Sequence, residues 1–331
     1  MSEALVDRYD AALFDLDGVV YLGPDAVAAA PGTIAQLRGR GVRVGFVTNN
    51  AARATTTVAH HLTRLGMPTE PEEVVSSAQA VAGLAAQRLG EGARVLVTGT
   101  PALADEVASR GLEVVAGARD EPQAVIQGYD PDIAWPSLEE AGFALQGGAR
   151  WFAANPDITR PTDRGLVPGI GTQIQVVASV SPVEPEMAGK PFRPLLDATV
   201  DRLGCETPIF VGDRLDTDIL GAHNAGMDSL FVLTGAHGVH DLLNADPAER
   251  PTHVASDLSG LLDPPAHLTV TEGVVRCGRA SAAERGGRAV VIDLPEGRQG
   301  HLDALRALLH LVHDEGVRAD HDEVDRLSEL A

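Results

Sequence analysis

Short apolar runs alternate with amphipathic stretches along most of this chain. Apolar runs at residues 9–15 and 42–47 flank a helical pattern over about 31–40, and a second helical pattern over about 54–65 stops at Gly66. Uninterrupted apolar runs are typical of strands buried on both faces, and the helices between them serve as the crossovers of a parallel sheet. The opening residues therefore predict an α/β fold with a doubly wound parallel sheet.

A second alternating region begins near Ser76 and interrupts the first. Its apolar runs lie at 93–99, 112–115, 124–129 and 150–155, and a helical pattern lies at 137–147. The original pattern then resumes, with helices expected at 192–204 and 216–226 and strands at 207–213 and 229–235. We therefore expect residues 1–75 and 186–262 to form one domain, and residues 76–185 to form an inserted α/β domain.

The composition changes after Leu262, where DPPAH (263–267) reads as a linker. The remainder predicts two strands, about 268–277 and 288–294, and one helix, about 301–315. Residues 263–331 are thus expected to form a small α+β extension that leans on the main body or on a second subunit. Its EGRQGH stretch (296–301) is faintly similar to the pyrophosphate loop of acyl-CoA-dependent acetyltransferases, which suggests a degenerate remnant of that fold.

Charge and composition exclude several classes of partner. The net charge of −21 argues against nucleic acid and anionic membrane, because both require a basic face. No apolar run approaches the roughly 20 residues of a membrane helix, and the charged N-terminus does not resemble a signal peptide. Cys205 and Cys277 follow no metal or redox spacing. A cytoplasmic protein fits best, and a homodimer is the assembly that we consider.

Two acidic clusters follow predicted strands. Asp15 and Asp17 lie in FDLDGVVYLG (14–23), and VGDRLDTDI (211–219) contributes Asp213 and Asp218. Residues two apart share one side of a strand, so Asp15 and Asp17 would offer two carboxylates to one crevice. Ligands of open parallel sheets bind at the carboxyl edge, where carboxylates suit Mg²⁺. Turn-forming or helix-capping aspartates would show the same pattern.

Lys190 is the only lysine among 26 cationic Lys and Arg residues, and it lies in MAGKPFR (187–193). A coding bias toward arginine explains the arginines but not this exception. We expect Lys190 to be extended before Pro191, with Pro191 in the first turn of the next helix. Its compact ammonium could hold a phosphoryl oxygen. Thr48 and Asn49 add further donors at another strand end.

The four motifs together resemble the haloacid-dehalogenase superfamily of phosphatases over about residues 8–262. They are DLDG (15–18), VTNN (47–50), GKP (189–191) and GDRLDTD (212–218). The insert lies where this family carries its C2-type cap, and residues 154–171 resemble the cap of the NagD-like subfamily of nucleotide, phosphoglycolate and pyridoxal phosphatases. The branch of bacterial glycerol 3-phosphate phosphatases, which also carries a C-terminal extension, is most similar.

The resemblance implies a role for each acidic residue. Asp15 would be the nucleophile that forms an aspartyl-phosphate, and Asp17 the general acid and base. Asp15 and Asp213 would bind Mg²⁺ through their carboxylates, and Asp17 would bind it through its backbone carbonyl. Asp218 would lie behind these ligands. Lys190, together with Thr48 and Asn49, would hold the phosphoryl group.

The expected substrate is a small phosphorylated metabolite, because a cap domain closes over a small crevice. The resemblance favours glycerol 3-phosphate, with phosphoglycolate, pyridoxal phosphate and nucleotides as alternatives. A non-catalytic sensor of a phosphorylated metabolite is the rival from another class. Candidates for contact with the leaving group are Asn155, Asp157 and Arg164, which could equally be turn residues. His237 and His240 are interpreted as parts of a solvated turn.

Overall fold

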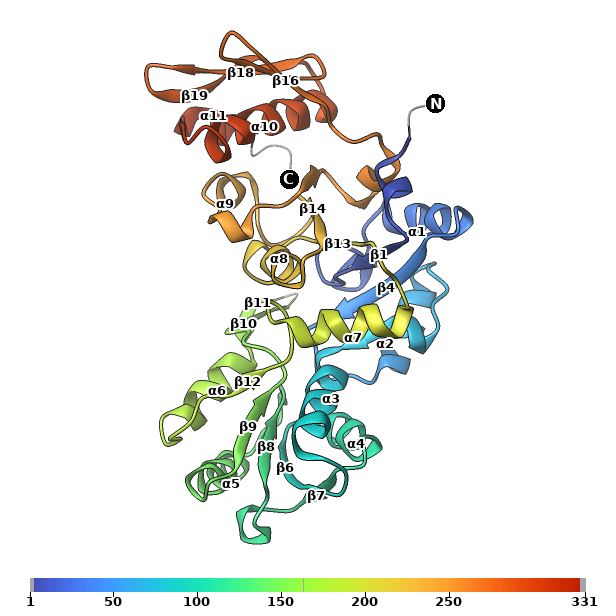
Figure 1. Cartoon of the computed structure of the whole chain (residues 1–331), viewed down its shortest axis with the longest axis vertical. Helices are drawn as coiled ribbons and strands as arrows, with labels where there is room; N and C mark the ends of the chain where they lie inside the picture. The colour runs from blue at the N-terminus through green and yellow to red at the C-terminus, as the bar shows by residue number, and fades with distance from the viewer. Residues whose placement is uncertain (1–2, 163, 328–331) are drawn as a thin grey trace. The chain divides into compact units, whose positions relative to one another are not determined.

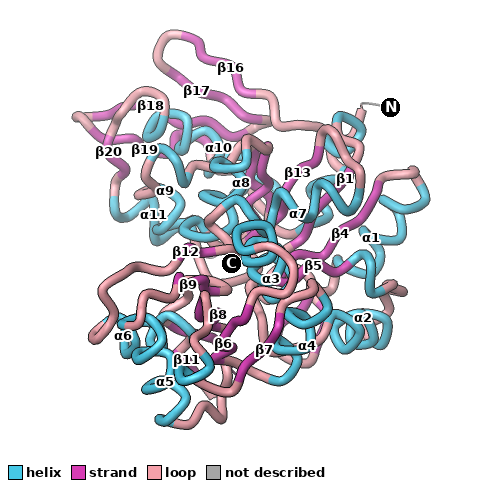
Figure 2. Tube along the Cα trace, turned by 60° about the horizontal axis from the view of Figure 1, so that its bottom comes forward, coloured by secondary structure: helices cyan, strands magenta, loops and turns pink. Residues whose placement is uncertain are grey.

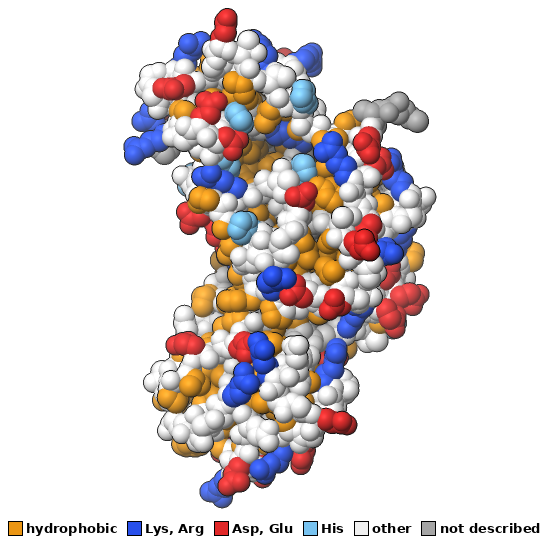
Figure 3. Space-filling view, viewed as in Figure 1, with side chains coloured by type: hydrophobic (Ala, Val, Ile, Leu, Met, Phe, Trp, Pro, Cys, Tyr) orange, Lys and Arg blue, Asp and Glu red, His pale blue; other side chains and the backbone are white. Residues whose placement is uncertain are grey.

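The computed structural model describes residues 3–162 and 164–327. It divides into two compact units, residues 1–44 with 205–331 and residues 45–204 (Figure 1). Each unit is described by itself. Within the described residues, no helix is both long and apolar enough to cross a membrane. Acidic and basic side chains are interspersed over the face shown in Figure 3.

The first unit is built on parallel strands β1 (Ala11–Phe14), β13 (Pro208–Gly212), β14 (Asp228–Val232) and β15 (His253–Ala255). They belong to a sheet of order β15-β14-β13-β1-β4-β5, in which β4 (Arg43–Thr48) crosses the division at residue 45 and β5 (Val74–Ser76) lies beyond it. Every residue of β1 is buried, as its continuous apolar run predicts. The parallel α/β fold class is confirmed.

Short helical segments connect the strands of the first unit. A 3₁₀ turn covers Leu5–Arg8, β2 (Tyr21–Leu22) and β3 (Asp25–Ala26) pair as a hairpin, and α1 (Ala30–Gly39) precedes β4. A π-helical turn, Leu215–Ile219, leads into α8 (Leu220–Ala225), which Gly226 ends in the left-handed conformation. The helix α9 (Val239–Leu243) follows β14, and 3₁₀ turns cover Pro247–Glu249 and Leu258–Leu262.

The C-terminal extension contains more elements than the sequence predicts. Its sheet has the order β16-β17-β18-β19-β20, and α10 (Arg298–His313) and α11 (His321–Leu327) complete it. The strands are Leu268–Thr271, Val274–Cys277, Ala280–Arg285, Arg288–Asp293 and Arg318–Ala319. The prediction of one strand over 268–277 is wrong, because Glu272 and Gly273 adopt positive φ and turn the chain back. The alanine-rich strand β18 has low strand propensity and was missed.

The extension and the parallel-sheet part of the same unit share one apolar core. Leucines of α10 pack with Leu242 and Leu243 of α9, and Figure 1 shows α10 lying along the extension sheet. Partly buried polar contacts join the same surfaces. The Arg306 guanidinium donates to the Val254 carbonyl at 2.7 Å, and a ring nitrogen of His313 lies 2.9 Å from the Leu242 carbonyl.

The second unit contains a five-stranded parallel sheet with the order β12-β9-β8-β6-β7. Its strands are β6 (Arg94–Thr98), β7 (Glu113–Val115), β8 (Ala124–Gln127), β9 (Arg150–Ala153) and β12 (Glu186–Met187). Helix α3 (Ser77–Leu89) precedes β6, and helices α4 (Pro101–Ser109), α5 (Trp135–Gln146) and α6 (Ile170–Ala178) lie between later strands of the sheet (Figure 2). The hairpin β10 (Thr159–Thr162) and β11 (Gly165–Pro168) precedes α6, and a 3₁₀ turn covers Ala118–Asp120.

The second unit also holds the end of β4, the strand β5 and helices α2 (Thr55–Arg64) and α7 (Arg193–Leu203), with a 3₁₀ turn at Pro71–Glu73. The prediction that Pro191 opens the next helix is wrong. Phe192 donates its N–H to the Gly189 carbonyl at 2.9 Å, which closes a turn over Lys190 and Pro191. The helix therefore begins two residues later, and Pro194 occupies its first turn.

Candidate active site

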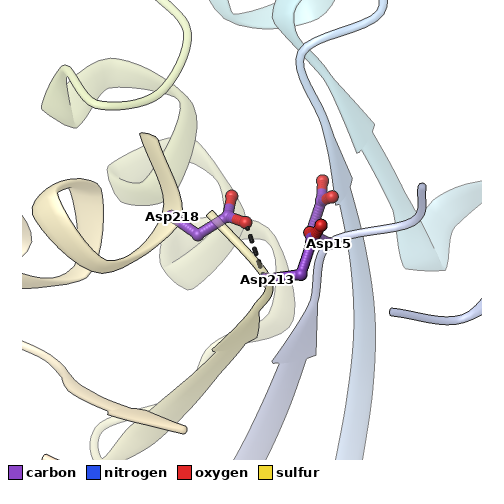
Figure 4. A group of neighbouring side chains, drawn as sticks. All are labelled: Asp15, Asp213 and Asp218. Atoms are coloured by element: carbon purple, nitrogen blue, oxygen red, sulfur yellow. Dashed lines mark hydrogen bonds between the residues drawn. The ribbon is translucent and has the colours of Figure 1, made fainter. Parts of the chain in front are cut away.

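Three aspartates of the first unit lie together. Asp15 directly follows β1, Asp213 follows β13, and Asp218 lies in the π-helical turn. Each offers a carboxylate oxygen within 4.8 Å of the others, and Figure 4 shows the three side chains. Asp213 and Asp218 are 2% and 1% exposed, while Asp15 is partly exposed. The two acidic clusters of the sequence thus converge on one group, which we call the carboxylate group.

Backbone hydrogen bonds set the positions of these carboxylates. Asp15 donates its N–H to the Val211 carbonyl at 2.9 Å, extending the β1–β13 ladder past the end of β1. Asp218 accepts the N–H groups of Asp213 and Arg214, each at 3.1 Å, and Figure 4 shows the bond from Asp213. Asp218 therefore fixes the backbone that carries Asp213.

The carboxylate group concentrates negative charge in a largely buried place. Two unit charges about 5 Å apart repel each other by roughly 3 kcal/mol at an effective dielectric constant of about 20. Three such carboxylates favour either a shared proton or a cation between them. Oxygen donors are the ligands that Mg²⁺ prefers. The donor chemistry of Asp15, Asp213 and Asp218 therefore fits a hard divalent cation.

Two neighbouring aspartates lie outside the carboxylate group. Both carboxylate oxygens of Asp216 accept from the Arg214 guanidinium, at 3.1 and 2.7 Å. Burial alone would raise the pKa of Asp216, but the hydrogen bond and charge of Arg214 outweigh it and lower that pKa. Asp17 is exposed, and its backbone pairs with Tyr21 in an isolated bridge.

Polar residues of the second unit form a separate network around Asn49. The Asn49 side chain contacts both backbone polar groups of Lys190: its carbonyl accepts the Lys190 N–H at 2.8 Å, and its amide donates to the Lys190 carbonyl at 3.0 Å. Lys190 is 2% exposed. Thr48, at the end of β4, accepts the Asn50 N–H at 3.0 Å. We call Thr48, Asn49, Lys190, Asn155 and Asp157 the asparagine network.

Asn155 and Asp157 complete the asparagine network from the segment after β9. The Asn155 amide donates to the Asn49 carbonyl, and its side-chain oxygen accepts the Asp157 N–H at 3.0 Å. The Asp157 carboxylate accepts from the Asn49 amide at 3.2 Å. A Cβ on Gly189 would press on the Ala154 carbonyl and on both Asn49 and Asn155, so only glycine fits there.

Arg164 does not join this network. It lies exposed in the turn between β10 and β11, where its N–H donates to the Thr162 hydroxyl at 3.3 Å. A different arginine of the hairpin, Arg160, lies 5.2 Å from the centre of the Tyr129 ring. Sequence analysis missed this pair, because an arginine and a tyrosine 31 positions apart carry no local signal.

Sequence analysis also missed the segment after β14. Its residues Thr234, Ala236 and His237 hydrogen-bond to the loops that carry Asp17 and Asp213. His237 is partly exposed in a loop, as its interpretation as a turn residue expects, and its ring in addition accepts the Leu215 N–H at 3.0 Å. His240, in α9, is exposed. The TGAHG pattern follows a buried strand, and that position was the available signal.

Comparison with known proteins agrees with this geometry. A model described as haloacid dehalogenase-like hydrolase matches residues 12–113, and a HAD-hydrolase-like model matches 187–261. The D-glycerol 3-phosphate phosphatase of Mycobacterium tuberculosis is 44% identical over 78% of this chain and 72% of its own length. An acid sugar phosphatase of Staphylococcus aureus is 33% identical over 76% of this chain and 96% of its own length.

Solved structures extend the comparison to the C-terminal extension. The glycerol phosphate phosphatase of Mycobacterium tuberculosis in complex with magnesium superposes with a TM-score of 0.84 at 36% identity, and it covers 100% of both chains. A 4-nitrophenylphosphatase of Thermotoga maritima has a TM-score of 0.73 at 28% identity, covering 78% of this chain and 98% of its own. The resemblance found in the sequence is confirmed: this chain belongs to the haloacid dehalogenase-like hydrolase family.

Proposed function

We propose that this chain hydrolyses a small phosphate monoester in the presence of Mg²⁺, with D-glycerol 3-phosphate as the favoured substrate. The carboxylate group carries the proposal, because it places the carboxylates of two family motifs within 4.8 Å of each other. Two similar proteins support this substrate. One is the 44% identical D-glycerol 3-phosphate phosphatase, and the other is the glycerol phosphate phosphatase structure that aligns with this chain over the full length of both. Phosphoglycolate, pyridoxal phosphate and nucleotides are the alternatives to test.

Mg²⁺ would be held by the carboxylates of Asp15 and Asp213 and by the backbone carbonyl of Asp17, with Asp218 supporting them from behind. The donors are all oxygens, as this cation requires. Bound Mg²⁺ would neutralise charge on the phosphoryl oxygens. The asparagine network would contribute Lys190 and Thr48 to the same phosphoryl group, so the proposal requires the two sets of residues to meet around the substrate.

The chemical roles in the proposal divide between Asp15 and Asp17. A carboxylate oxygen of Asp15 attacks phosphorus, the bond to the ester oxygen breaks, and Asp17 gives its proton to the departing alkoxide. Asp17 then takes a proton from water, whose oxygen attacks phosphorus and releases phosphate from Asp15. An exposed Asp17 can reach both an alcohol and water. The ionised Asp15 is the form that can act as nucleophile.

The remaining residues have supporting roles in this proposal. Asn49 holds the backbone of Lys190, while Asn155 and Asp157 hold Asn49. They therefore act on the phosphoryl group through Lys190. We propose Arg164, exposed in the β10–β11 turn, as the contact for the leaving group.

The wider biological setting is also proposed. We place the family core at residues 1–75 and 186–262, the cap at 76–185 and the extension at 263–331. The extension then serves as a packing element, and the shared apolar core of its α10 with α9 supports this. We propose a cytoplasmic enzyme that assembles as a homodimer.

A substrate panel tests the proposed function. Phosphate release is measured for glycerol phosphates, phosphoglycolate, pyridoxal phosphate and nucleotides, with Mg²⁺ and with a chelator. We expect the highest kcat/KM for D-glycerol 3-phosphate and no turnover without the metal. Tight binding of these esters without any hydrolysis would contradict the proposal and would favour a metabolite sensor. A higher kcat/KM for another ester would contradict the proposed substrate but not the proposed phosphatase activity.

A further inference from the structure

The segment Thr234–His237 leaves the carboxyl end of β14 and touches three loops of the carboxylate group, all within the first unit. The Thr234 hydroxyl donates to the Gly18 carbonyl at 2.6 Å. The Ala236 N–H donates to a carboxylate oxygen of Asp213 at 2.6 Å, and the His237 N–H donates to the Asp213 carbonyl at 3.2 Å. One short segment thus bonds to both acidic loops.

The side chain of His237 adds a fourth hydrogen bond. One ring nitrogen accepts the N–H of Leu215, the first residue of the π-helical turn, at 3.0 Å. That turn carries Asp218, which in turn accepts the N–H of Asp213. His237 therefore ties the start of the turn to the same segment that contacts Asp213.

Two glycines allow the Asp213 carboxylate to be enclosed this closely. A Cβ on Gly235 would collide with the Asp213 side chain, and a Cβ on Gly18 would collide with the same carboxylate. The Cβ of Gly18 would also lie 3.0 Å from the Gly235 Cα, and Gly18 has a φ of +89° that favours glycine. The backbone of the loops after β1 and β14 therefore packs directly against the Asp213 side chain, with no room for a Cβ between them.

We infer that Thr234–His237 is a positioning segment, which sets the orientation of the Asp213 carboxylate and the distance between Asp213 and the Asp17–Gly18 loop. Thr234 and His237 are its positioning residues. This inference rests on the proposed function, since it concerns the residues proposed to hold Mg²⁺ and to transfer the proton. The segment donates to both the Gly18 carbonyl and the Asp213 carboxylate.

The geometry explains why such a segment matters. Mg²⁺ demands near-ideal octahedral geometry, so a carboxylate that rotates binds it less well. The Ala236 N–H restricts that rotation by occupying one oxygen of Asp213. A displacement of about 1 Å at a reacting group can cost about a hundredfold in rate. The Thr234 bond to Gly18 limits such displacement for the loop that carries Asp17.

Variants of the two positioning residues test the inference. Thr234→Val keeps the shape of the side chain and removes the hydroxyl donor, so we expect kcat to fall about tenfold with little change in KM. His237→Phe removes the acceptor for the Leu215 N–H, so we expect Mg²⁺ affinity, measured by isothermal titration calorimetry on the full chain, to fall about tenfold. His237→Gln, which keeps a side-chain acceptor, should restore part of that affinity.

Thr199→Val provides the matched control. The Thr199 hydroxyl is buried and donates to the Leu195 carbonyl at 2.8 Å, inside α7. A purely structural role for Thr234 predicts that both valine variants lower Tm to a similar extent and leave kcat and Mg²⁺ affinity within twofold of the wild type. That result, or a His237→Phe variant with unchanged Mg²⁺ affinity, would overturn the inference.

The same measurements separate this inference from the proposed function. A wild type that neither binds Mg²⁺ in calorimetry nor hydrolyses phosphate esters would overturn both. A wild type that binds and hydrolyses normally, beside variants that do the same, would overturn the positioning segment alone. The cooperativity of each variant's thermal transition shows whether the variant is folded. If His237→Phe loses Mg²⁺ affinity because it unfolds, the Mg²⁺ affinity of His237→Gln decides the outcome.

Discussion

The carboxylate group and the asparagine network are organised in opposite ways. In the first, three acidic side chains converge, and backbone N–H groups hold Asp213 and Asp218 in place. In the second, one neutral amide, Asn49, bonds to both backbone polar groups of Lys190 and to the Asp157 carboxylate. The carboxylate group concentrates like charge, whereas the asparagine network joins backbone and side-chain polar groups to one another by hydrogen bonds.

The difference shows what each part needs from a ligand. Converging carboxylates are costly without a cation, so the carboxylate group is prepared for a metal. The asparagine network already holds its backbone in place, so its contribution is a preformed position for Lys190. We therefore expect substitutions in the first to change metal binding, and substitutions in the second to change turnover with metal binding intact.

Removal of the nucleophile should have the largest effect. Asp15→Asn keeps the size of the side chain but lacks the attacking carboxylate, so we expect kcat to fall by about 10⁴-fold or more. Phosphate release in Mg²⁺ measures this, and Asp216→Asn is the control, because Asp216 pairs with Arg214 outside the carboxylate group. Activity of Asp15→Asn near that of Asp216→Asn would remove Asp15 from its role.

Exchange of the single lysine should have the next largest effect. Lys190→Arg keeps the charge but places a broad planar guanidinium in a position that is 2% exposed. We expect kcat/KM to fall by about 10²- to 10³-fold while Mg²⁺ affinity stays normal. Arg193→Lys, an exposed exchange in the same region, should change nothing. Near-normal kinetics for Lys190→Arg would make the lysine incidental.

Loss of the Asn49 amide should have an intermediate effect and sharpens the comparison most. Asn49→Ala leaves the backbone groups of buried Lys190 without that partner, at a cost of roughly 1–3 kcal/mol of stability. We expect kcat to fall about 10- to 100-fold, with Mg²⁺ affinity by calorimetry unchanged. Asn244→Ala, which removes an exposed amide that donates to the His240 carbonyl at 2.7 Å, is the control. Weaker Mg²⁺ binding in Asn49→Ala would break the division between the two parts.

The smallest effect should come from a histidine that belongs to neither part. Burial is the main cause that lowers the pKa of His313 below its usual 6.5, and the charge of Arg250 lowers it further. The unfolded chain then takes up a proton near pH 6.5 that the folded chain does not, so this contribution to stability is present above that pH and is lost as the pH falls below it.

Thermal unfolding between about pH 7 and pH 5.5 tests this expectation. The Tm of the wild type should fall more steeply than that of His313→Gln, while kcat at neutral pH stays the same in both. The exposed His267→Gln variant is the control and should follow the wild type. A steeper fall for His313→Gln than for the wild type would show that the sign is wrong.

The sequence predicted the parts whose signal is local. Apolar runs located β1, β4, β13 and β14, and the acidic residues directly after them, Asp15 and Asp213, do lie together. This worked because parallel strands bring their carboxyl ends to one edge. The spacing of Gly226 after a helical pattern likewise located the end of α8.

The rest depends on contacts between distant residues. Asn49 bonds to a residue 141 positions away, and no pattern near either residue announces this. The hydrogen bond between the Leu215 N–H and the His237 ring joins residues 22 positions apart, and only the tertiary fold brings them together. The alanine-rich strand β18 has weak intrinsic preference and is held by its sheet neighbours and α10. Tertiary packing decided these elements against their local signal.

A crystal structure grown with Mg²⁺ and a tetrahedral phosphate analogue tests the central claim most directly. That claim is that the carboxylate group and the asparagine network act on one phosphoryl group. The account predicts a metal ion bound to carboxylate oxygens of Asp15 and Asp213, with the analogue held by the Lys190 ammonium and the Thr48 hydroxyl. A metal ion bound elsewhere, or an analogue that Lys190 does not contact, would contradict it.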